Sequence, residues 1–321
     1  DSNGGGIGAG DFNNDGLVDL FFTANQGTDR LYLNQGYLTF EDITEQAGVG
    51  GPSGATSWTT GVSIADVNAD GWLDIYVCQI SGFEQLSGKN RLYINQGASE
   101  QDKAVEGQLP SFTESAAAYG LDIASYAQHA AFFDYDNDGD LDMYLLNLAV
   151  HTPETYKEAA LRNRRDSLSG DRLFQNRDGY FVDVSEAAGI FGGAMGYGLG
   201  LSIGDINNDT WPDIYVSNDF HENDYLYYNM GDGTFKENIV GSMGHVSTFS
   251  MGNDIADFDN DGWLDVMTID MKPFDESVLK VSAGVDPYNI YQYKLGFGYH
   301  YQYARNMLQR NVGPLLSLIH I

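Results

Sequence analysis

The chain has 321 residues, of which 42% are hydrophobic, so it carries enough apolar material for a packed core. Lys and Arg total 16 against 46 Asp and Glu, and the formal net charge is −30. A surface of this sign repels phosphate backbones and anionic lipids, and no apolar run approaches the ~18 residues that span a bilayer. We therefore expect no nucleic-acid partner and no membrane span. The single cysteine, Cys78, excludes an intramolecular disulfide, and we interpret it as a buried hydrophobic residue.

Both ends of the sequence look truncated. The chain opens on a glycine run, without an initiator Met or a signal peptide, so we expect it to be a piece of a longer protein. Residues 316–321 continue no upstream pattern, and we interpret them as a sequencing artefact encoded by an adapter. The alternative is an ordinary C-terminal strand.

Five nine-residue segments share one acidic pattern, and their starts are 55, 68, 71 and 52 residues apart. These segments are Asp11–Asp19, Asp66–Asp74, Asp134–Asp142, Asp205–Asp213 and Asp257–Asp265. Short runs rich in aromatic and β-branched residues recur in phase with them, separated by Gly, Asn and Asp, and predict four strands per period. Four antiparallel strands per repeat are typical of a β-propeller blade, whereas a sandwich would not repeat one loop in every unit. The sequence therefore predicts an all-β propeller of four-stranded blades.

The predicted propeller covers residues 1–315, with repeats starting near residues 7, 61, 129, 198 and 251. The longer periods indicate three insertions, at residues 98–110, 151–171 and 272–305. A basic stretch, residues 157–177, starts within the second insertion. It could dock an acidic partner, face the acidic rim of its own propeller, or form a solvated helix. The third insertion is rich in aromatic residues, which could contact a ligand or pack the insertion onto the propeller.

Each acidic loop has carboxylates at positions 1, 5 and 9 and an Asp or Asn at position 3. A calcium ion takes six to eight oxygen ligands at about 2.3–2.6 Å. The side chains at positions 1, 3, 5 and 9, together with the main-chain carbonyl of position 7, would supply most of that shell. The candidate calcium ligands are Asp11, Asn13, Asp15, Leu17, Asp19, Asp66, Asn68, Asp70, Trp72, Asp74, Asp134, Asp136, Asp138, Asp140, Asp142, Asp205, Asn207, Asp209, Trp211, Asp213, Asp257, Asp259, Asp261, Trp263 and Asp265. The alternative is a set of surface Asx turns without metal.

The residue at position 6 divides the loops into two kinds. Glycine there permits the positive φ that turns the chain around an ion, and it is found at Gly16, Gly71, Gly139 and Gly262. Thr210 replaces it in the fourth loop, so we expect that loop to bind calcium most weakly. We expect the loops at Asp134 and Asp257 to bind most tightly, because each carries four carboxylates at ligand positions.

An EF-hand begins with the same nine residues, but it requires a bidentate Glu at position 12 and flanking helices. Position 12 is occupied here by Phe22, Val77, Leu145, Val216 and Thr268. The EF-hand interpretation therefore fails.

The repeats resemble those of FG-GAP/VCBS proteins, whose blades carry a DxDxDGxxD calcium loop between their first two strands, as in integrin α-subunit propellers. Residues 217–227, 249–266 and 301–311 are similar to the bacterial branch related to cartilage acidic protein, which often carries an ASPIC/UnbV domain after the propeller. The resemblance implies about five calcium sites and a ring that closes with about seven blades. It also implies secretion or display at the cell surface. Four complete repeats and a partial fifth then predict an incomplete ring, about five of seven blades.

The sequence gives no support for catalysis, because it contains neither a GxSxG elbow nor an HExxH motif. We expect a non-catalytic calcium-binding module of a secreted or cell-surface protein, which binds a glycan or protein ligand. The alternative is a calcium-dependent polysaccharide lyase or glycosidase on the same scaffold.

Overall fold

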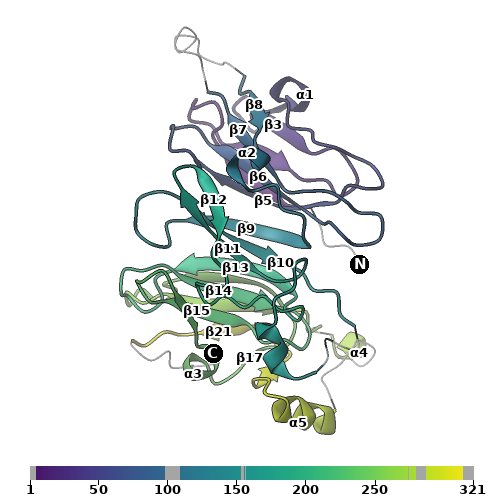
Figure 1. The fold of residues 1–321 in the computed structure, drawn as a ribbon, viewed down its shortest axis with the longest axis vertical. Coiled ribbons are helices and arrows are strands. Elements are labelled where there is room, and N and C mark those ends of the chain that lie inside the picture. The colour runs from purple at the N-terminus through teal and green to yellow at the C-terminus, as the bar shows by residue number, and fades with distance from the viewer. Residues whose placement is uncertain are drawn as a thin grey trace. The chain divides into compact units, whose positions relative to one another are not determined.

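The computed structural model describes residues 5–97, 109–152, 155, 157–273, 275–279 and 287–313. The chain forms two compact units, drawn in Figure 1 with colours that follow the sequence. The first comprises Asp1–Phe132, Gly139–Leu145 and Phe174–Asp183, and the second comprises Phe133–Asp138, Leu146–Leu173 and Val184–Ile321. The suspected artefact at 316–321 and most of the insertion at 98–110 lie outside the described residues.

The first unit contains two complete antiparallel sheets in which the strands follow one another in sequence order. The first sheet consists of β1 (Ile7–Gly10), β2 (Asp19–Phe22), β3 (Arg30–Asn34) and β4 (Phe40–Asp42). The second consists of β5 (Thr59–Ala65), β6 (Asp74–Gln79), β7 (Arg91–Asn95) and β8 (Phe112–Glu114). One short helical turn follows each sheet, α1 (Thr44–Ala47) and α2 (Ala116–Tyr119).

A third sheet has the same topology, and most of its residues belong to the first unit. Its strands are β9 (Ala127–Phe133), β10 (Asp142–Asn147), β11 (Arg172–Arg177) and β12 (Tyr180–Asp183).

The second unit contains a fourth sheet of four strands and a three-stranded sheet. The four strands are β13 (Gly198–Gly204), β14 (Asp213–Asn218), β15 (Tyr225–Asn229) and β16 (Phe235–Glu237), followed by the turn α3 (Ile239–Ser242). The three-stranded sheet consists of β18 (Ser250–Ala256), β19 (Asp265–Asp270) and β21 (Met307–Gln309). The prediction of an all-β chain with four-stranded blades is therefore confirmed.

The inserted segments of the second unit add little regular structure. A 3-10 helix, η1 (Ala159–Asn163), lies between β10 and β11. Between β19 and β21 the chain forms α4 (Glu276–Leu279), α5 (Tyr288–Gly296) and β20 (Gln302–Tyr303). Strand β20 pairs in parallel with β17 (Val246–Ser247).

In the second and fourth sheets, which we call the inner sheets, the second strand is the centre of the packing. Every residue of β6 and of β14 is buried, which explains their nearly continuous apolar sequences. Cys78 in β6 is fully buried, as the sequence analysis predicts, and burial raises the pKa of its thiol far above the ordinary value. In the first unit Tyr76, Leu92 and Met143 pack in one cluster, and in the second unit Tyr215 and Leu226 belong to another. A further cluster of the first unit includes Phe21, Leu31 and Val77, and the apolar burial in these clusters stabilises each unit.

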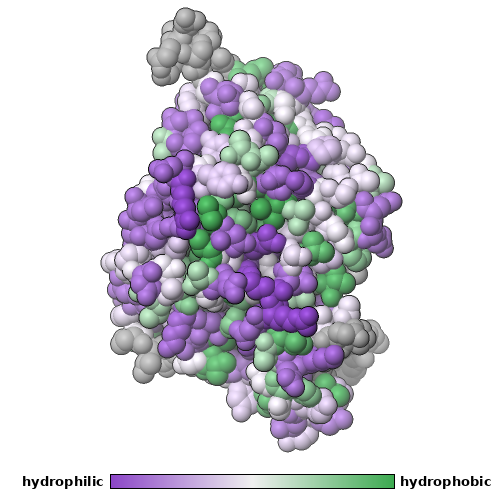
Figure 2. All heavy atoms as spheres, in the orientation of Figure 1, coloured by the Kyte–Doolittle hydropathy of each residue, from purple (hydrophilic) through white to green (hydrophobic). Residues whose placement is uncertain are grey.

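The second strand of the first sheet and that of the three-stranded sheet each leave one face uncovered. In β19, Met267 is 37% exposed and Ile269 is 51% exposed. On the first sheet, a hollow of about 400 Å³ is lined by Leu20, Phe22, Arg30, Tyr32 and Phe40. On the face drawn in Figure 2, polar residues separate the exposed apolar residues into small groups. The two uncovered sheet faces are therefore unusual, because the corresponding face of each inner sheet is buried.

We expect the chain expressed alone to self-associate through these two sheet faces, because another blade is what covers the corresponding face of each inner sheet. Replacing Phe22 and Ile269 together by Ser should shift the chain toward monomer in sedimentation-velocity experiments. The matched control is Val240→Ser, which removes an apolar residue that is 60% exposed on α3 and should leave association unchanged. A chain that stays monomeric at all concentrations without any substitution would contradict this expectation.

Candidate metal centres

The first aspartate of every acidic loop is held by the main chain of its own loop. The N–H of position 5 donates to Oδ1 of position 1 over 3.0, 3.0, 3.1, 2.9 and 3.0 Å, in chain order. In four loops the N–H of position 6 donates to Oδ2 of the same aspartate, over 2.7–2.9 Å. The five loops therefore share one conformation, wrapped around the position 1 carboxylate.

Two positions of each loop have a positive φ. At position 6, the four glycines have φ between 87° and 96°, which confirms the expectation, and Thr210 is held at 76°. At position 4, φ lies between 56° and 60° in all five loops, which the sequence analysis did not identify. Asn occupies position 4 in four loops and tolerates this conformation, so its recurrence was the available signal. Ala69 and Thr210 lack that tolerance and store backbone strain.

The residues at positions 3 and 7 are both tied to the aspartate at position 5. In the first, second and fourth loops, Nδ2 of the position 3 asparagine donates to Oδ2 of position 5, over 3.0, 2.9 and 2.8 Å. In four loops the N–H of position 7 donates to Oδ1 of position 5 over 2.8–3.0 Å. These bonds fix the position 5 carboxylate before any ion binds.

The aspartate at position 9 joins its loop to the third strand of the same sheet. All five of these aspartates are buried, with at most 2% of their surface exposed. Their Oδ1 atoms accept hydrogen bonds of 2.7–2.9 Å from the main-chain N–H of an asparagine at or just beyond the end of the third strand. In four loops Oδ2 accepts from the N–H of position 2 over 2.9–3.2 Å. Because each carboxylate oxygen has two lone pairs, these bonds leave capacity for a cation.

Burial raises the pKa of three position 9 carboxylates, those of Asp19, Asp74 and Asp213. The pKa of Asp74 is raised to about 6 and that of Asp213 to about 7, first by burial and further by the carboxylates at positions 5 and 1, while main-chain hydrogen bonds oppose the rise. A cation beside these groups would favour their charged form.

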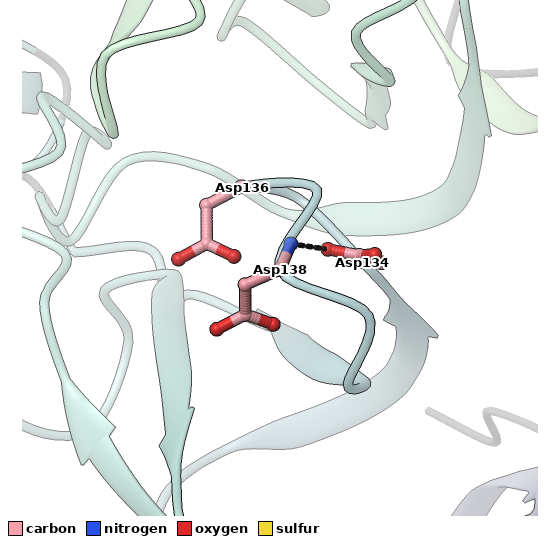
Figure 3. A group of neighbouring side chains, drawn as sticks. All are labelled: Asp134, Asp136 and Asp138. Carbon is pink, nitrogen blue, oxygen red and sulfur yellow. Dashed lines mark hydrogen bonds between the residues drawn. The ribbon is translucent and has the colours of Figure 1, made fainter.

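Two loops bring three carboxylates together, and both have four carboxylates at ligand positions. Oxygens of Asp134, Asp136 and Asp138 lie within 4.8 Å of one another, as do those of Asp257, Asp259 and Asp265. Figure 3 shows the first group, with the hydrogen bond from the N–H of Asp138 to Asp134. Within the described part of the chain, the three loops with Asn at position 3 form no such group. The oxygen-only ligand set is the kind that calcium prefers.

An asparagine at or just beyond the end of the third strand is a structural residue of these centres that the sequence analysis missed. It is found at Asn34, Asn95, Asn176, Asn229 and Asn311. In every case Nδ2 donates to the main-chain carbonyl of position 8 in its own loop, over 2.9–3.3 Å. Its recurrence at the same place in all five repeats was the sequence signal by which it could have been identified.

In three blades this asparagine also reaches the preceding loop. Nδ2 of Asn95 donates to the carbonyl of Phe12 over 2.9 Å. Nδ2 of Asn229 reaches the carbonyl of Tyr135, and that of Asn311 reaches the carbonyl of Ile206, each over 2.7 Å. One amide group therefore links two consecutive acidic loops. We call it the asparagine clamp.

A second recurrent side chain, also missed, closes the connection between the second and third strands. An Asp or Asn directly before the third strand accepts a hydrogen bond of 2.8–2.9 Å from a main-chain N–H at the end of the second strand. These acceptors are Asp29, Asn90, Asp171, Asp224 and Asn306. Their carboxylate and amide oxygens act on the backbone rather than on a ligand.

The two inserted segments of the second unit pack against each other. The N–H of Ala159 donates to the carbonyl of Phe297 over 3.0 Å, and the hydroxyl of Tyr299 donates to the carbonyl of Lys157 over 2.9 Å. Arg162 forms an ion pair of 2.8 Å with Glu222, which is fully buried. This part of the basic stretch therefore pairs with an acid of the same chain.

His221, which directly precedes Glu222 in the chain, is not set up as a general acid or base. Burial, followed by the neighbouring His151, lowers the pKa of His221 to about 3. Its Nε2 lies 3.2 Å from the carbonyl of Thr155. A general base works best with a pKa near the working pH, so His221 serves the packing of the insertion.

Comparison with known proteins agrees with this geometry. A family model described as FG-GAP-like repeat matches residues 11–77 and 205–268, and each match begins at an acidic loop. The chain contains FG-GAP-like repeats. This match confirms the resemblance that the sequence analysis drew from the loops.

The chain is also similar to cartilage acidic protein 1. It is 28% identical to the Mus musculus protein over 147 residues, which is 46% of this chain and 20% of that protein. It is 23% identical to the Xenopus tropicalis protein over 212 residues, which is 66% of this chain and 28% of that protein. The chain thus spans between a fifth and three tenths of these relatives, and the expected relation to this branch is confirmed at low identity.

One solved structure is that of an Agrocybe aegerita lectin, described as recognising non-reducing terminal N-acetylglucosamine specifically. It is 17% identical, with a TM-score of 0.44, and the likeness covers 82% of this chain and 60% of the lectin chain. A likeness of this size carries no argument about function. In the described part of the chain, no helix has the length and apolarity needed to cross a membrane.

We expect Asn229→Ala to lower the free energy of unfolding by about 2–3 kcal/mol, because it removes the buried hydrogen bond from Nδ2 to the carbonyl of Tyr135 and the partly buried bond to the carbonyl of Pro212. The matched control is Asn34→Ala, since the bond from Nδ2 of Asn34 to the carbonyl of Val18 is exposed, and the expected loss is below about 1 kcal/mol. Denaturant titration of both variants measures the difference. Equal losses in the two variants would show that the asparagine clamp adds nothing beyond a local turn.

Proposed function

We propose that this protein is a non-catalytic, calcium-stabilised recognition module of a secreted or cell-surface protein, which binds a glycan or protein ligand. The observation that carries the calcium part is the shared conformation of the five loops, in which main-chain N–H groups hold the aspartates at positions 1 and 9. The relation to cartilage acidic protein 1 supports a role outside the cell.

Repulsion between carboxylates is what a cation would relieve. Each loop concentrates three or four carboxylates at its side-chain ligand positions, and the chain as a whole carries a formal net charge of −30. Five calcium ions, each adding two positive charges, would bring this value to −20. In our proposal the residues at positions 1, 3, 5 and 9 hold the ion, and the positive charge of the ion favours the charged form of the buried position 9 carboxylate.

Calcium would act on more than one strand at a time. Each loop joins the first strand of a sheet to the second, and position 9 joins it to the third. In three repeats the asparagine clamp also joins the loop to the loop of the repeat before it. A ligand that binds the folded state alone stabilises that state.

Removal of calcium should therefore lower the melting temperature, by about 10 °C or more if several sites each contribute about 1 kcal/mol. Calorimetry in excess calcium and in excess chelator measures the change, and elemental analysis establishes that the metal has left. Magnesium at equal concentration is the control, since it prefers octahedral geometry and retains its water. An unchanged melt after verified metal removal would refute the structural role of calcium.

A polar hollow beside the fourth loop favours a glycan as the ligand. Its volume is about 340 Å³, and its lining includes Asn207, Asp209, Tyr228, Lys236 and Asn238. The ring of Tyr228, with the amide of Asn238 and the ammonium group of Lys236 in the same lining, suits a saccharide, whose C–H face stacks on the ring while its hydroxyls form hydrogen bonds.

Binding to an immobilised glycan array tests this part of the proposal. Tyr228→Ala should abolish binding of the recognised glycan, because it removes the stacking surface of the hollow. Tyr288→Ala is the matched control, since Tyr288 is 79% exposed on α5, far along the chain from the hollow. Binding that survives Tyr228→Ala would place the ligand elsewhere. The alternative of a lyase or glycosidase predicts shortened products after incubation, whereas a binding module returns the glycan intact.

A further inference from the structure

An arginine from outside the fifth acidic loop forms contacts with its aspartates. Arg310 directly follows β21 and contacts two aspartates of the loop. Its Nη2 donates to Oδ2 of Asp261 over 3.0 Å, and its Nε forms an ion pair with Oδ2 of Asp259. These aspartates hold positions 3 and 5, which are two of the four side-chain ligand positions.

The corresponding residue in the other four repeats is uncharged. The residue directly before the asparagine clamp is Leu33, Ile94, Gln175, Tyr228 and Arg310, in chain order. A charged residue at this position is therefore specific to the fifth repeat, whereas the fold is common to all five repeats.

The fifth loop differs from the third in which carboxylates converge. The third loop brings together positions 1, 3 and 5, as Asp134, Asp136 and Asp138. The fifth brings together positions 1, 3 and 9, as Asp257, Asp259 and Asp265, while Asp261 bonds Arg310. A guanidinium group presents several N–H donors in a fixed plane, which suits carboxylate oxygens. It thus takes up oxygens that a cation would need.

We propose that Arg310 is a built-in counter-ion of the fifth loop, which competes with calcium for Asp259 and Asp261. The fifth loop then binds calcium more weakly than the third, although the two carry the same number of carboxylates at ligand positions. This revises the expectation from sequence that the loops at Asp134 and Asp257 are the two tightest. The inference rests on the proposed function, namely that the loops bind calcium.

The expected effect is moderate, because Arg310 is partly exposed and its charge is screened by water. A calcium ion entering the loop either displaces the guanidinium group or binds beside a positive charge. We expect Arg310→Gln, which copies the third repeat, to tighten calcium binding at the fifth loop about tenfold.

Terbium luminescence can follow the fifth loop by itself. Trp263 is at position 7 of that loop, so the signal lost in a Trp263→Phe background belongs to this site. The midpoint for terbium, and for calcium that displaces it, should move to lower concentration in Arg310→Gln. Arg310→Lys should remain close to the unsubstituted chain, because it keeps the charge. Arg305→Gln is the matched control, since it removes an exposed positive charge that contacts Tyr303 instead of the loop.

A second readout separates competition from a purely structural role. In chelator, Arg310→Gln should melt at a lower temperature than the unsubstituted chain, because the carboxylates lose their counter-ion. Its stabilisation by calcium should be larger. A merely structural arginine would lower stability in chelator and leave the midpoint at the fifth loop unchanged or weaker.

The outcomes distinguish the two proposals. Calcium uptake by the loops with an unchanged or weakened fifth-loop midpoint in Arg310→Gln overturns the role of Arg310 alone. No uptake by any loop, in the unsubstituted chain and in Arg310→Gln, overturns both proposals. Tightening confined to the fifth loop, absent in Arg305→Gln, supports the competition.

Discussion

The hydrogen bond between the position 9 aspartate and the third strand is the interaction on which each repeat depends. A carboxylate that is almost fully buried is costly unless its oxygens are satisfied, and here both oxygens face main-chain donors. The same bonds fix the depth at which the acidic loop enters the sheet. They also place the other carboxylates of the loop toward solvent, where an ion can reach them. The repeat therefore obtains a fixed fold and an accessible charge cluster from one side chain.

The two ends of each sheet use acidic and amide side chains in different ways. At the end of the acidic loops, oxygens converge on one another and favour a cation. At the opposite end of the second strand, a single Asp or Asn before the third strand accepts a hydrogen bond from a main-chain N–H and so supports the backbone. Asp224 shows the cost, because burial raises its pKa to about 7 despite hydrogen bonds from Asn218, Tyr215 and Ser250. The high acidic content of the chain is thus divided between ligand chemistry and backbone support.

Much of the fold could be predicted from the sequence, because its signals repeat. Five copies of a loop with fixed aspartate positions, four of them with glycine at position 6, identify the strands on either side, and the positive φ at Gly16 or Gly262 follows from residue type. The asparagine clamp was missed because Asn in a turn-rich context reads as a turn former, and its partner Phe12 lies 83 residues from Asn95. Contacts such as Tyr299 to Lys157 join segments 142 residues apart and leave no periodic trace. The role of Arg310 could not be predicted from the sequence, because the number of carboxylates at ligand positions places its loop among the tightest calcium sites. Atomic positions were needed to show that Arg310 contacts two of these carboxylates.

The asparagine clamp gives the repeats a direction. In the three observed cases the amide belongs to the later repeat and the carbonyl to the loop of the repeat before it. During synthesis the earlier loop emerges first, so it can be complete when the later asparagine arrives. Each new blade then finds its acceptor already in place and does not wait for sequence still to be translated. A repeat array with this polarity can fold in step with the ribosome, one blade at a time.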